Sequence, residues 1–346
     1  MKYQSVRPEL AFWFLLGLGA VDLAIAQFPV TRRRRAAFVV LTIVGATLLV
    51  AAFPFRYSGS NLAPLWLAEA EAFLLAGIFL REVVFRRAGL VTALLTAAQL
   101  LLVNATQVFS QRVLVGAPAV PDFRLGAVFA AAVLVFYVNA HGVARKWTEL
   151  FEDGVDQAGL VASSYLAALL ALVGAWIVWP DAWTAVSWAA LAAALAFAGL
   201  WLDSPALRAQ AGALGAAALL RALVTNLELE APRGPFSLRL ITVGTVAALF
   251  YLASWWLGRA GTRRSRGLRA AFTSAAALLV ATLAAVEMPR AWVAVHWLAF
   301  AILLGWIAAR LTREDFAWQS NALAVSAFVY TLARSEERRV GKECRL

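Results

Sequence analysis

Ionisable and amide side chains inside long apolar runs are the groups of this sequence best placed to act on an ion or a substrate. Glu69, Glu71 and Arg221 each lie roughly 8–10 Å inside the ends of their runs, at about 1.5 Å per helical residue. Gln99 and His296 lie at a similar depth. We therefore predict an intramembrane polar cluster in which one glutamate meets Arg221, with Gln99 or His296 beside them.

The alternative to this cluster leaves its members apart. The long arginine side chain would then reach outward to the lipid headgroups, while each glutamate bonds a hydroxyl or backbone group. Glu69 and Glu71 are two positions apart on one helix and point in nearly opposite directions. At most one of the two glutamates is therefore expected to contact Arg221.

Asp22, Asn139 and His141 form a second polar set, near the ends of their runs that adjoin the more basic connections. An acid, an amide and an imidazole at one depth could relay a proton. The alternative is that they are ordinary helix-end residues at the level of the headgroups.

The segment 146–156 (KWTELFEDGVD) is expected to form a short amphipathic helix on the membrane surface. At 100° per residue, one face is aromatic and apolar and the other is acidic. The apolar face would hold Trp147, Leu150, Phe151 and Val155, and the acidic face Glu149, Glu152, Asp153 and Asp156. The acidic row is either a solvated face or a site that gathers a cation or a basic partner.

Motifs for metals, cofactors and nucleotides are missing from the sequence. It has two histidines and a single cysteine, Cys344, so it has neither a zinc spacing nor a disulfide framework. P-loop, G-x-G-x-x-G and G-x-S-x-G patterns are also missing. We therefore expect no metal and no cofactor, and the lack of a recognisable acid–base pair favours a protein that is not an enzyme.

The elements that must position these side chains are membrane-spanning helices. Of the 346 residues, 62% are hydrophobic and 15% charged, with a mean hydropathy of +0.75, which is far more apolar than a soluble domain. Apolar runs of about 17–22 residues match the length that crosses a bilayer. The predicted fold is an all-α, polytopic transmembrane bundle of about 12 spans, at 9–27, 36–53, 63–80, 88–109, 125–144, 158–179, 184–202, 208–226, 238–258, 268–287, 291–311 and 315–333.

The arginines and lysines of the connections predict the orientation. Alternate connections hold seventeen basic residues on one side and eight on the other. Because basic residues stay cytoplasmic, both ends of 1–334 are expected outside a bacterial inner membrane. The net charge of +11 then reflects contact with anionic lipid headgroups rather than with nucleic acid.

An internal repeat of a helical hairpin is indicated by the pattern W-x10-G-x8-R-x17-N, which occurs twice. Its anchors are Trp66, Gly77, Arg86 and Asn104 in one copy, and Trp188, Gly199, Arg208 and Asn226 in the other. The hairpins AEAFLLAGIFLREVVFRRAGL and LAFAGLWLDSPALRAQAG resemble those of a large family of many-spanning bacterial membrane proteins of unknown function. The resemblance implies a multi-hairpin membrane fold and carries no activity.

The last twelve residues, 335–346 (SEERRVGKECRL), are expected to be a non-native tail, because they resemble a translated adaptor sequence. The native part, 1–334, would then be a fragment of a longer protein. The function expected first is a structural or assembly role without catalysis. The alternatives are a transporter or flippase for a small or lipid-like substrate, and an intramembrane transferase on a lipid-linked substrate.

Overall fold

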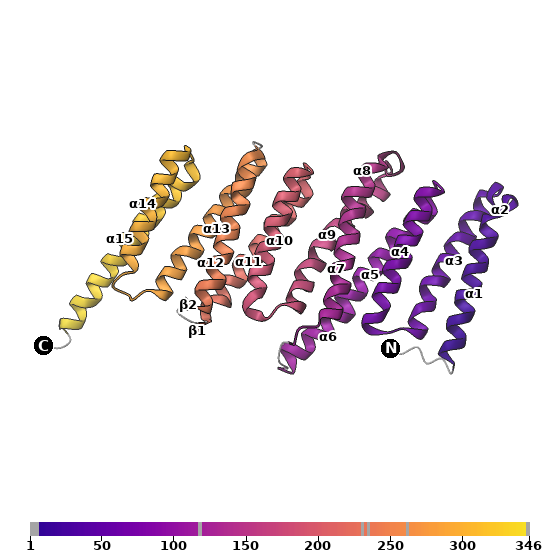
Figure 1. Ribbon diagram of the computed structural model, residues 1–346, viewed down its shortest axis with the longest axis horizontal. Coiled ribbons are helices and arrows are strands. Elements are labelled where there is room, and N and C mark those ends of the chain that lie inside the picture. The colour runs from indigo at the N-terminus through magenta and orange to yellow at the C-terminus, as the bar shows by residue number, and fades with distance from the viewer. Residues whose placement is uncertain (1–6, 117–119, 230–231, 234–235, 261–262, 344–346) are drawn as a thin grey trace. The chain divides into compact units, whose positions relative to one another are not determined.

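The protein is an all-α membrane protein, which confirms the predicted fold class. Its computed structural model describes residues 7–116, 120–229, 232–233, 236–260 and 263–343 (Figure 1). The chain divides into two compact units, Met1–Val178 and Trp179–Leu346. Within each unit, helices of similar length pair into antiparallel hairpins.

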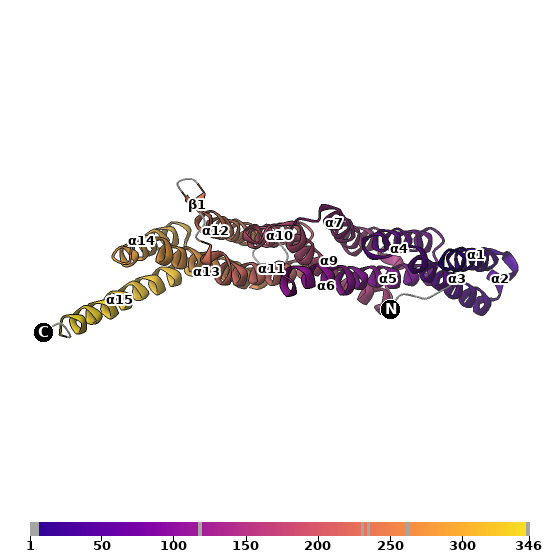
Figure 2. The ribbon, with the colours of Figure 1, turned by 90° about the horizontal axis from the view of Figure 1, so that it is seen from below.

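Unit 1 stacks three hairpins, α1/α3, α4/α5 and α7/α9, whose first helices form one layer and second helices the other (Figure 2). The connections between the two helices of each hairpin, which we call the tips, lie at one end of the unit (Figure 1). The opposite ends of the hairpins, which we call the bases, lie at the other end. The helices are α1 (Pro8–Gln27), α2 (Pro29–Arg33), α3 (Arg35–Arg56), α4 (Leu62–Phe79), α5 (Val83–Ala98), α6 (Thr106–Phe109), α7 (Phe123–Tyr137), α8 (Ala144–Lys146) and α9 (Gly154–Val178).

Unit 2 repeats this plan with the hairpins α10/α11, α12/α13 and α14/α15 (Figures 1 and 2). Its helices are α10 (Asp181–Trp201), α11 (Pro205–Val224), α12 (Leu238–Leu257), α13 (Arg263–Glu287), α14 (Val293–Leu311) and α15 (Glu314–Glu343). Two two-residue strands, β1 (Pro232–Arg233) and β2 (Phe236–Ser237), pair between α11 and α12.

Eleven helices of the described chain are long and apolar enough to cross a membrane, and each matches one of the first eleven predicted spans. The twelfth prediction, 315–333, falls in α15, which is not among the eleven. Between 17% and 44% of each span is buried inside the protein. Most of the surface of each span is therefore left to face lipid, as expected where hydrocarbon is the solvent.

The longest span, Val83–Leu114, continues α5 through two π-helical stretches, Gln99–Ala105 and Ser110–Leu114. A third π-helical stretch, Val138–Val143, extends α7. π-helical turns are uncommon and frequently lie at functional sites. One of these three holds two of the predicted polar residues, Asn139 and His141.

Three hairpins share one tip geometry. A residue with positive φ follows the first helix in each of them: Arg81 (53°), Asp203 (43°) and Thr312 (50°). The next backbone N–H donates to a carbonyl five residues earlier, from Glu82 to Gly77, Ser204 to Gly199 and Arg313 to Ala308, at 2.9, 2.9 and 3.1 Å. This left-handed cap satisfies carbonyls that end the first helix and turns the chain directly into the second.

The bases of these three hairpins also share one type of contact. In each, a side chain near the end of the second helix forms a hydrogen bond with a backbone group near the start of the first helix. Asn226 donates to the carbonyl of Ala182 at 2.7 Å, and Tyr330 donates to that of Arg290 at 3.2 Å. The amide of Asn104, oriented so that both of its groups are satisfied, accepts from Ser60 N–H at 3.3 Å.

Tryptophan links two of the hairpins to the helix before them. The indole N–H of Trp66 donates to the carbonyl of Val50 in α3 at 3.0 Å. That of Trp297 donates to Ala281 in α13 at 2.8 Å. In both cases the acceptor lies sixteen residues before the donor, so successive hairpins are joined by the same bond.

Candidate functional site

Ion pairs join the hairpin tips of unit 1. Arg35 on α3 contacts Glu82 at the tip of α4/α5, with 2.7 Å between Nη1 and Oε2. The next junction is a group that we call the tip network, made of Arg81, Arg86 and Arg87 from α4/α5, and Glu149, Asp153 and Asp156 from the α7/α9 connection. At its exposed edge, Arg87 contacts Asp153 at 2.6 Å and Arg81 contacts Glu149 at 3.6 Å.

The centre of the tip network is buried. The carboxylate of Asp156 is fully buried and accepts from Arg87 at 2.9 Å and from Arg86 at 3.4 Å. Arg86 itself is 4% exposed, and its guanidinium lies 5.5 Å from the ring centroid of Phe151. A buried guanidinium needs such a counter-charge, because an unpaired charge away from water is very costly.

The amphipathic surface helix expected over 146–156 is therefore not formed. Trp147 leaves helical geometry at φ −124° and ψ 48°, Thr148–Leu150 is a single 3-10 turn, and α9 begins at Gly154. Asp156 of the expected acidic face is buried, whereas Val155 of the expected apolar face is 61% exposed. Ion pairing with Arg86 and Arg87 on α5 turns Asp156 toward the protein interior. This pairing outweighs the apolar–acidic periodicity from which the surface helix was expected. Glu152 stays exposed, and Trp147 and Leu150 pack beside Phe151.

The corresponding arginine in unit 2 is used differently. Arg208 bonds its own hairpin tip, the carbonyl of Gly199 and the carboxylate of Asp203, both at 3.1 Å. When the two copies of the repeat are aligned, Asp203 occupies the position of Arg81. Arg208 therefore pairs with an aspartate at the tip of its own hairpin. The repeat anchors thus occupy similar places but make different ion pairs.

Asp315 supplies the ion pair between hairpins in unit 2. Its carboxylate contacts Arg313 at 2.7 Å and Arg269 of α13 at 3.6 Å. Burial alone would raise the pKa of Asp315, but the hydrogen bonds from Arg313 and the charge of Arg269 hold that pKa below its ordinary value. The pairing therefore persists at neutral pH.

Two of the predicted intramembrane residues meet, and they come from different predicted sets. The amide of Asn139 donates to Glu71 at 2.5 Å, which joins α4 to the π-helical stretch of α7. The span holding Glu71 begins at Gly59 rather than near Pro64, so this glutamate lies about 18 Å along it, close to the middle. The depth expected for Glu71 was too shallow for this reason.

His141 lies in the same π-helical stretch as Asn139 and contacts the hydroxyl of Ser164 on α9 at 2.9 Å. Ser164 lies in an apolar run of small residues, and no charge or motif marks it as a polar partner. Asp22, the third member of the expected relay, makes no hydrogen bond or ion pair within the described residues. The trio is therefore not joined by direct bonds.

Glu69 differs from the other described acids within the spans. Both carboxylate oxygens are buried by protein atoms, and neither has a hydrogen-bond partner within the described chain. No described hydrogen bond links Gln99 to either glutamate. Burying a carboxyl group without a hydrogen-bond partner is costly, which sets this position apart from ordinary packing.

Arg221 and His296 have partners that the expected cluster did not include. The guanidinium of Arg221 contacts the carboxylate of Asp181 at 2.8 Å and lies 5.7 Å from the ring centroid of Trp188. His296 contacts the carbonyl of Trp292, one helical turn earlier, at 2.9 Å. Asp181 was overlooked because it follows Pro180 in a break between two apolar runs.

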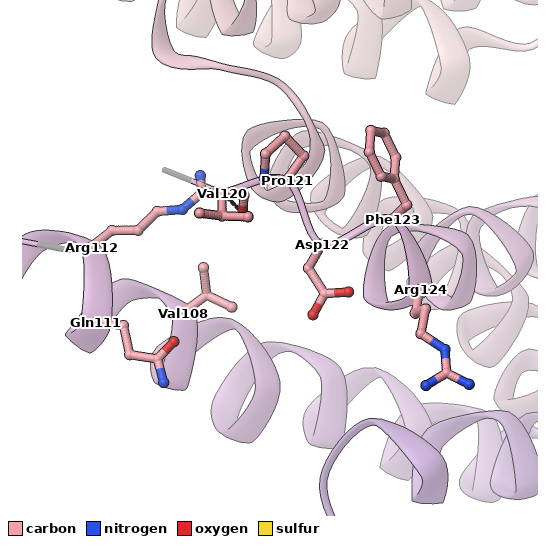
Figure 3. Close-up of a pocket in the computed structure, with 8 residues that line it drawn as sticks. All are labelled: Val108, Gln111, Arg112, Val120, Pro121, Asp122, Phe123 and Arg124. Atoms are coloured by element: carbon pink, nitrogen blue, oxygen red, sulfur yellow. Dashed lines mark hydrogen bonds between the residues drawn. The ribbon is translucent and has the colours of Figure 1, made fainter. Parts of the chain in front are cut away.

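A hollow of about 620 Å³ lies at the base of unit 1, between the end of the long span and the start of α7 (Figure 3). The side chain of Arg112 extends toward Val120 and donates to its carbonyl at 3.2 Å and to the carbonyls of Trp176 and Ile177 near the end of α9. Asp122 accepts from the N–H of Leu125 and so caps α7. Two of the polar side chains that line this hollow, Arg112 and Asp122, are thus bonded to backbone at helix ends and in the loop between them.

Comparison with protein-family models, with curated proteins and with solved structures gave no match. In the part of the chain that the structure describes, no group of three or more histidine, cysteine or acidic side chains could hold a metal ion. The polar side chains of the tips and bases mostly bond neighbouring hairpins or helix ends. Within the spans of unit 1, Glu69 and the bonded pair Glu71–Asn139 supply carboxyl groups that no basic side chain contacts in the described chain, and such groups could bind a proton or a cation.

Proposed function

We propose that this chain is a structural or assembly protein of a bacterial inner membrane and carries out no catalysis. The observation that supports this most strongly is the use of its charged side chains. Arg86 and Asp156 are buried and, with the partly exposed Arg87, pair one hairpin with the next. The buried carboxylate of Asp315 joins α13 to α15 through Arg269. A protein that fixes its hairpins to each other at the tips is suited to hold other components in place.

In this proposal, successive pairs of hairpins are copies of one unit arranged in tandem. Trp66, Trp188 and Trp297 follow one another at intervals of 122 and 109 residues. The same two intervals relate the tip residues Arg81, Asp203 and Thr312. Each copy then comprises four helices, as α12 to α15 do in unit 2, and stacked copies of this kind present long surfaces to partners.

Placement in the membrane completes the proposal. The tips lie on the cytoplasmic side, because the more basic set of connections coincides with them. Arginines there that contact no carboxylate of the described residues, such as Arg32 and Arg33, bind anionic lipid headgroups.

A second function, transport coupled to a proton or a cation, is favoured by one observation. In the described chain the two buried carboxylate oxygens of Glu69 have no hydrogen-bond partner, and Glu71 is bonded only to an amide. Carboxyl groups in a membrane without a basic partner are typical of proton relays in pumps and transporters.

Complementation of a strain lacking the gene distinguishes the two functions. We expect the triple variant Glu69→Gln, Glu71→Gln, His141→Gln to restore the phenotype as well as the wild type does, because these changes keep the shape and remove only titration. Membrane levels of each protein are measured alongside, and Glu228→Gln, at an exposed span end, is the matched control. A triple variant that accumulates normally but restores nothing would overturn the structural role in favour of transport.

A further inference from the structure

The arginines near the tips of unit 2 fall into two groups. Arg208, Arg269 and Arg313 each contact a carboxylate, at 3.1, 3.6 and 2.7 Å. Arg259 and Arg310, like Arg266 on α13, are exposed and have no hydrogen-bond or ion-pair partner within the described residues. The guanidinium groups of Arg259 and Arg310 therefore keep their full charge and their donors for a ligand.

Both of these arginines lie over a tryptophan four residues earlier. The guanidinium carbon of Arg259 is 5.7 Å from the ring centroid of Trp255, and that of Arg310 is 5.5 Å from that of Trp306. The two indoles are 53% and 58% exposed, so these contacts lie on the surface of the protein rather than in its core. The pattern W-x3-R thus presents the same pair on α12 and on α14.

The depth of both pairs matches the headgroup region. Arg310 precedes the last residue of its span by one position, and Arg259 follows the last residue of its span by two. Both pairs belong to the layer formed by the first helices of the hairpins (Figure 2). Indole rings favour this level of a bilayer, where the phosphates of lipids also lie.

We propose that the Trp255–Arg259 and Trp306–Arg310 pairs are two binding sites for the phosphate of an anionic phospholipid. The guanidinium fork fits two oxygens of a phosphate, and the indole keeps it at the membrane surface by a cation–π contact. The uncompensated positive charge selects anionic over zwitterionic lipids. This inference rests on the membrane placement in the proposed function, and it adds two specific phosphate sites to the general attraction between the basic tips and anionic lipid.

The test is lipid retention by the purified full-length chain, measured by native mass spectrometry during titration with phosphatidylglycerol or phosphatidylcholine. The wild type should retain phosphatidylglycerol preferentially. The double variant Arg259→Gln, Arg310→Gln should bind it about fivefold more weakly per arginine. Trp255→Leu with Trp306→Leu should also weaken binding while keeping the charge.

The matched control is Arg266→Gln with Arg290→Gln, which removes the same net charge from two exposed arginines that lie over no described ring. It should keep most of the preference for phosphatidylglycerol. If the Arg259/Arg310 and Arg266/Arg290 variants lost phosphatidylglycerol binding equally, the lipid would be attracted by overall charge. That result would overturn the two sites while leaving the membrane placement intact. A wild type without preference for the anionic lipid would overturn the sites as well.

Discussion

Replacing Asp156 with alanine should lower the free energy of unfolding by about 3–5 kcal/mol, the largest effect that we expect from a single side chain. This carboxylate is fully buried and is the described counter-charge of Arg86, which is itself 4% exposed. Without Asp156 a guanidinium is left in a protein interior with no compensating charge. Unfolding in mixed micelles by titration with a denaturing detergent measures the change.

Asp153→Ala is the control for this prediction, because Asp153 binds the same Arg87 from the surface, where its side chain is 52% exposed. Exposed pairs of this kind contribute up to about 1 kcal/mol. Equal losses for the two alanine variants would mean that burial of the pair does not matter, contrary to our description of the tip network.

Replacing Gly77 with alanine should cost about 1–3 kcal/mol, which is typical of overpacking. A Cβ on Gly77 would collide with the backbone N of Arg86 and lie 2.5 Å from its Cγ and 2.9 Å from its Cα. Because backbone atoms cannot turn aside as a flexible side chain does, α4 and α5 would have to separate at their tip. The same denaturation experiment measures the loss.

Alanine substitutions at two other glycines serve as comparisons for the expected loss of stability. Gly199→Ala should cost less, because its Cβ would lie 2.9 Å from Cγ and 3.0 Å from N of Arg208. Gly244→Ala, in α12 with nothing within 4 Å, should stabilise the helix by up to about 1 kcal/mol. If Gly77→Ala were as favourable as Gly244→Ala, the close approach of the two helices would be refuted.

Hydropathy was sufficient to predict the spans because the bilayer imposes one length on every helix that crosses it. The eleven spans found match eleven predicted ones, even where a span extends beyond the bilayer, as Val83–Leu114 does. The tip turns were less accessible to sequence reasoning. Arg81 and the β-branched Thr312 adopt positive φ although neither residue type favours it, so residue type did not mark these turns.

The polar contacts could be predicted only in part, because spacing along a helix gives depth but not the neighbour. Arg221 was placed correctly within its helix, yet its partner Asp181 lay in a segment read as a break. Asn139 was selected, but its partner Glu71 was assigned to another depth. The burial of Asp156 had one available signal, since the arginine pair on α5 needed carboxylates and the acidic segment 149–156 follows in the next hairpin.

The direction in which each hairpin crosses the membrane is tested most directly by cysteine labelling in intact cells, with Cys344→Ser as the background because Cys344 is the single cysteine of the sequence. Single cysteines at the tip positions 33, 203 and 312 should react only with reagent that has entered the cytoplasm. Single cysteines at the base positions 58, 122 and 228 should react with a reagent that cannot cross the membrane. A tip and a base that react from the same side would contradict the arrangement of paired spans proposed for this protein.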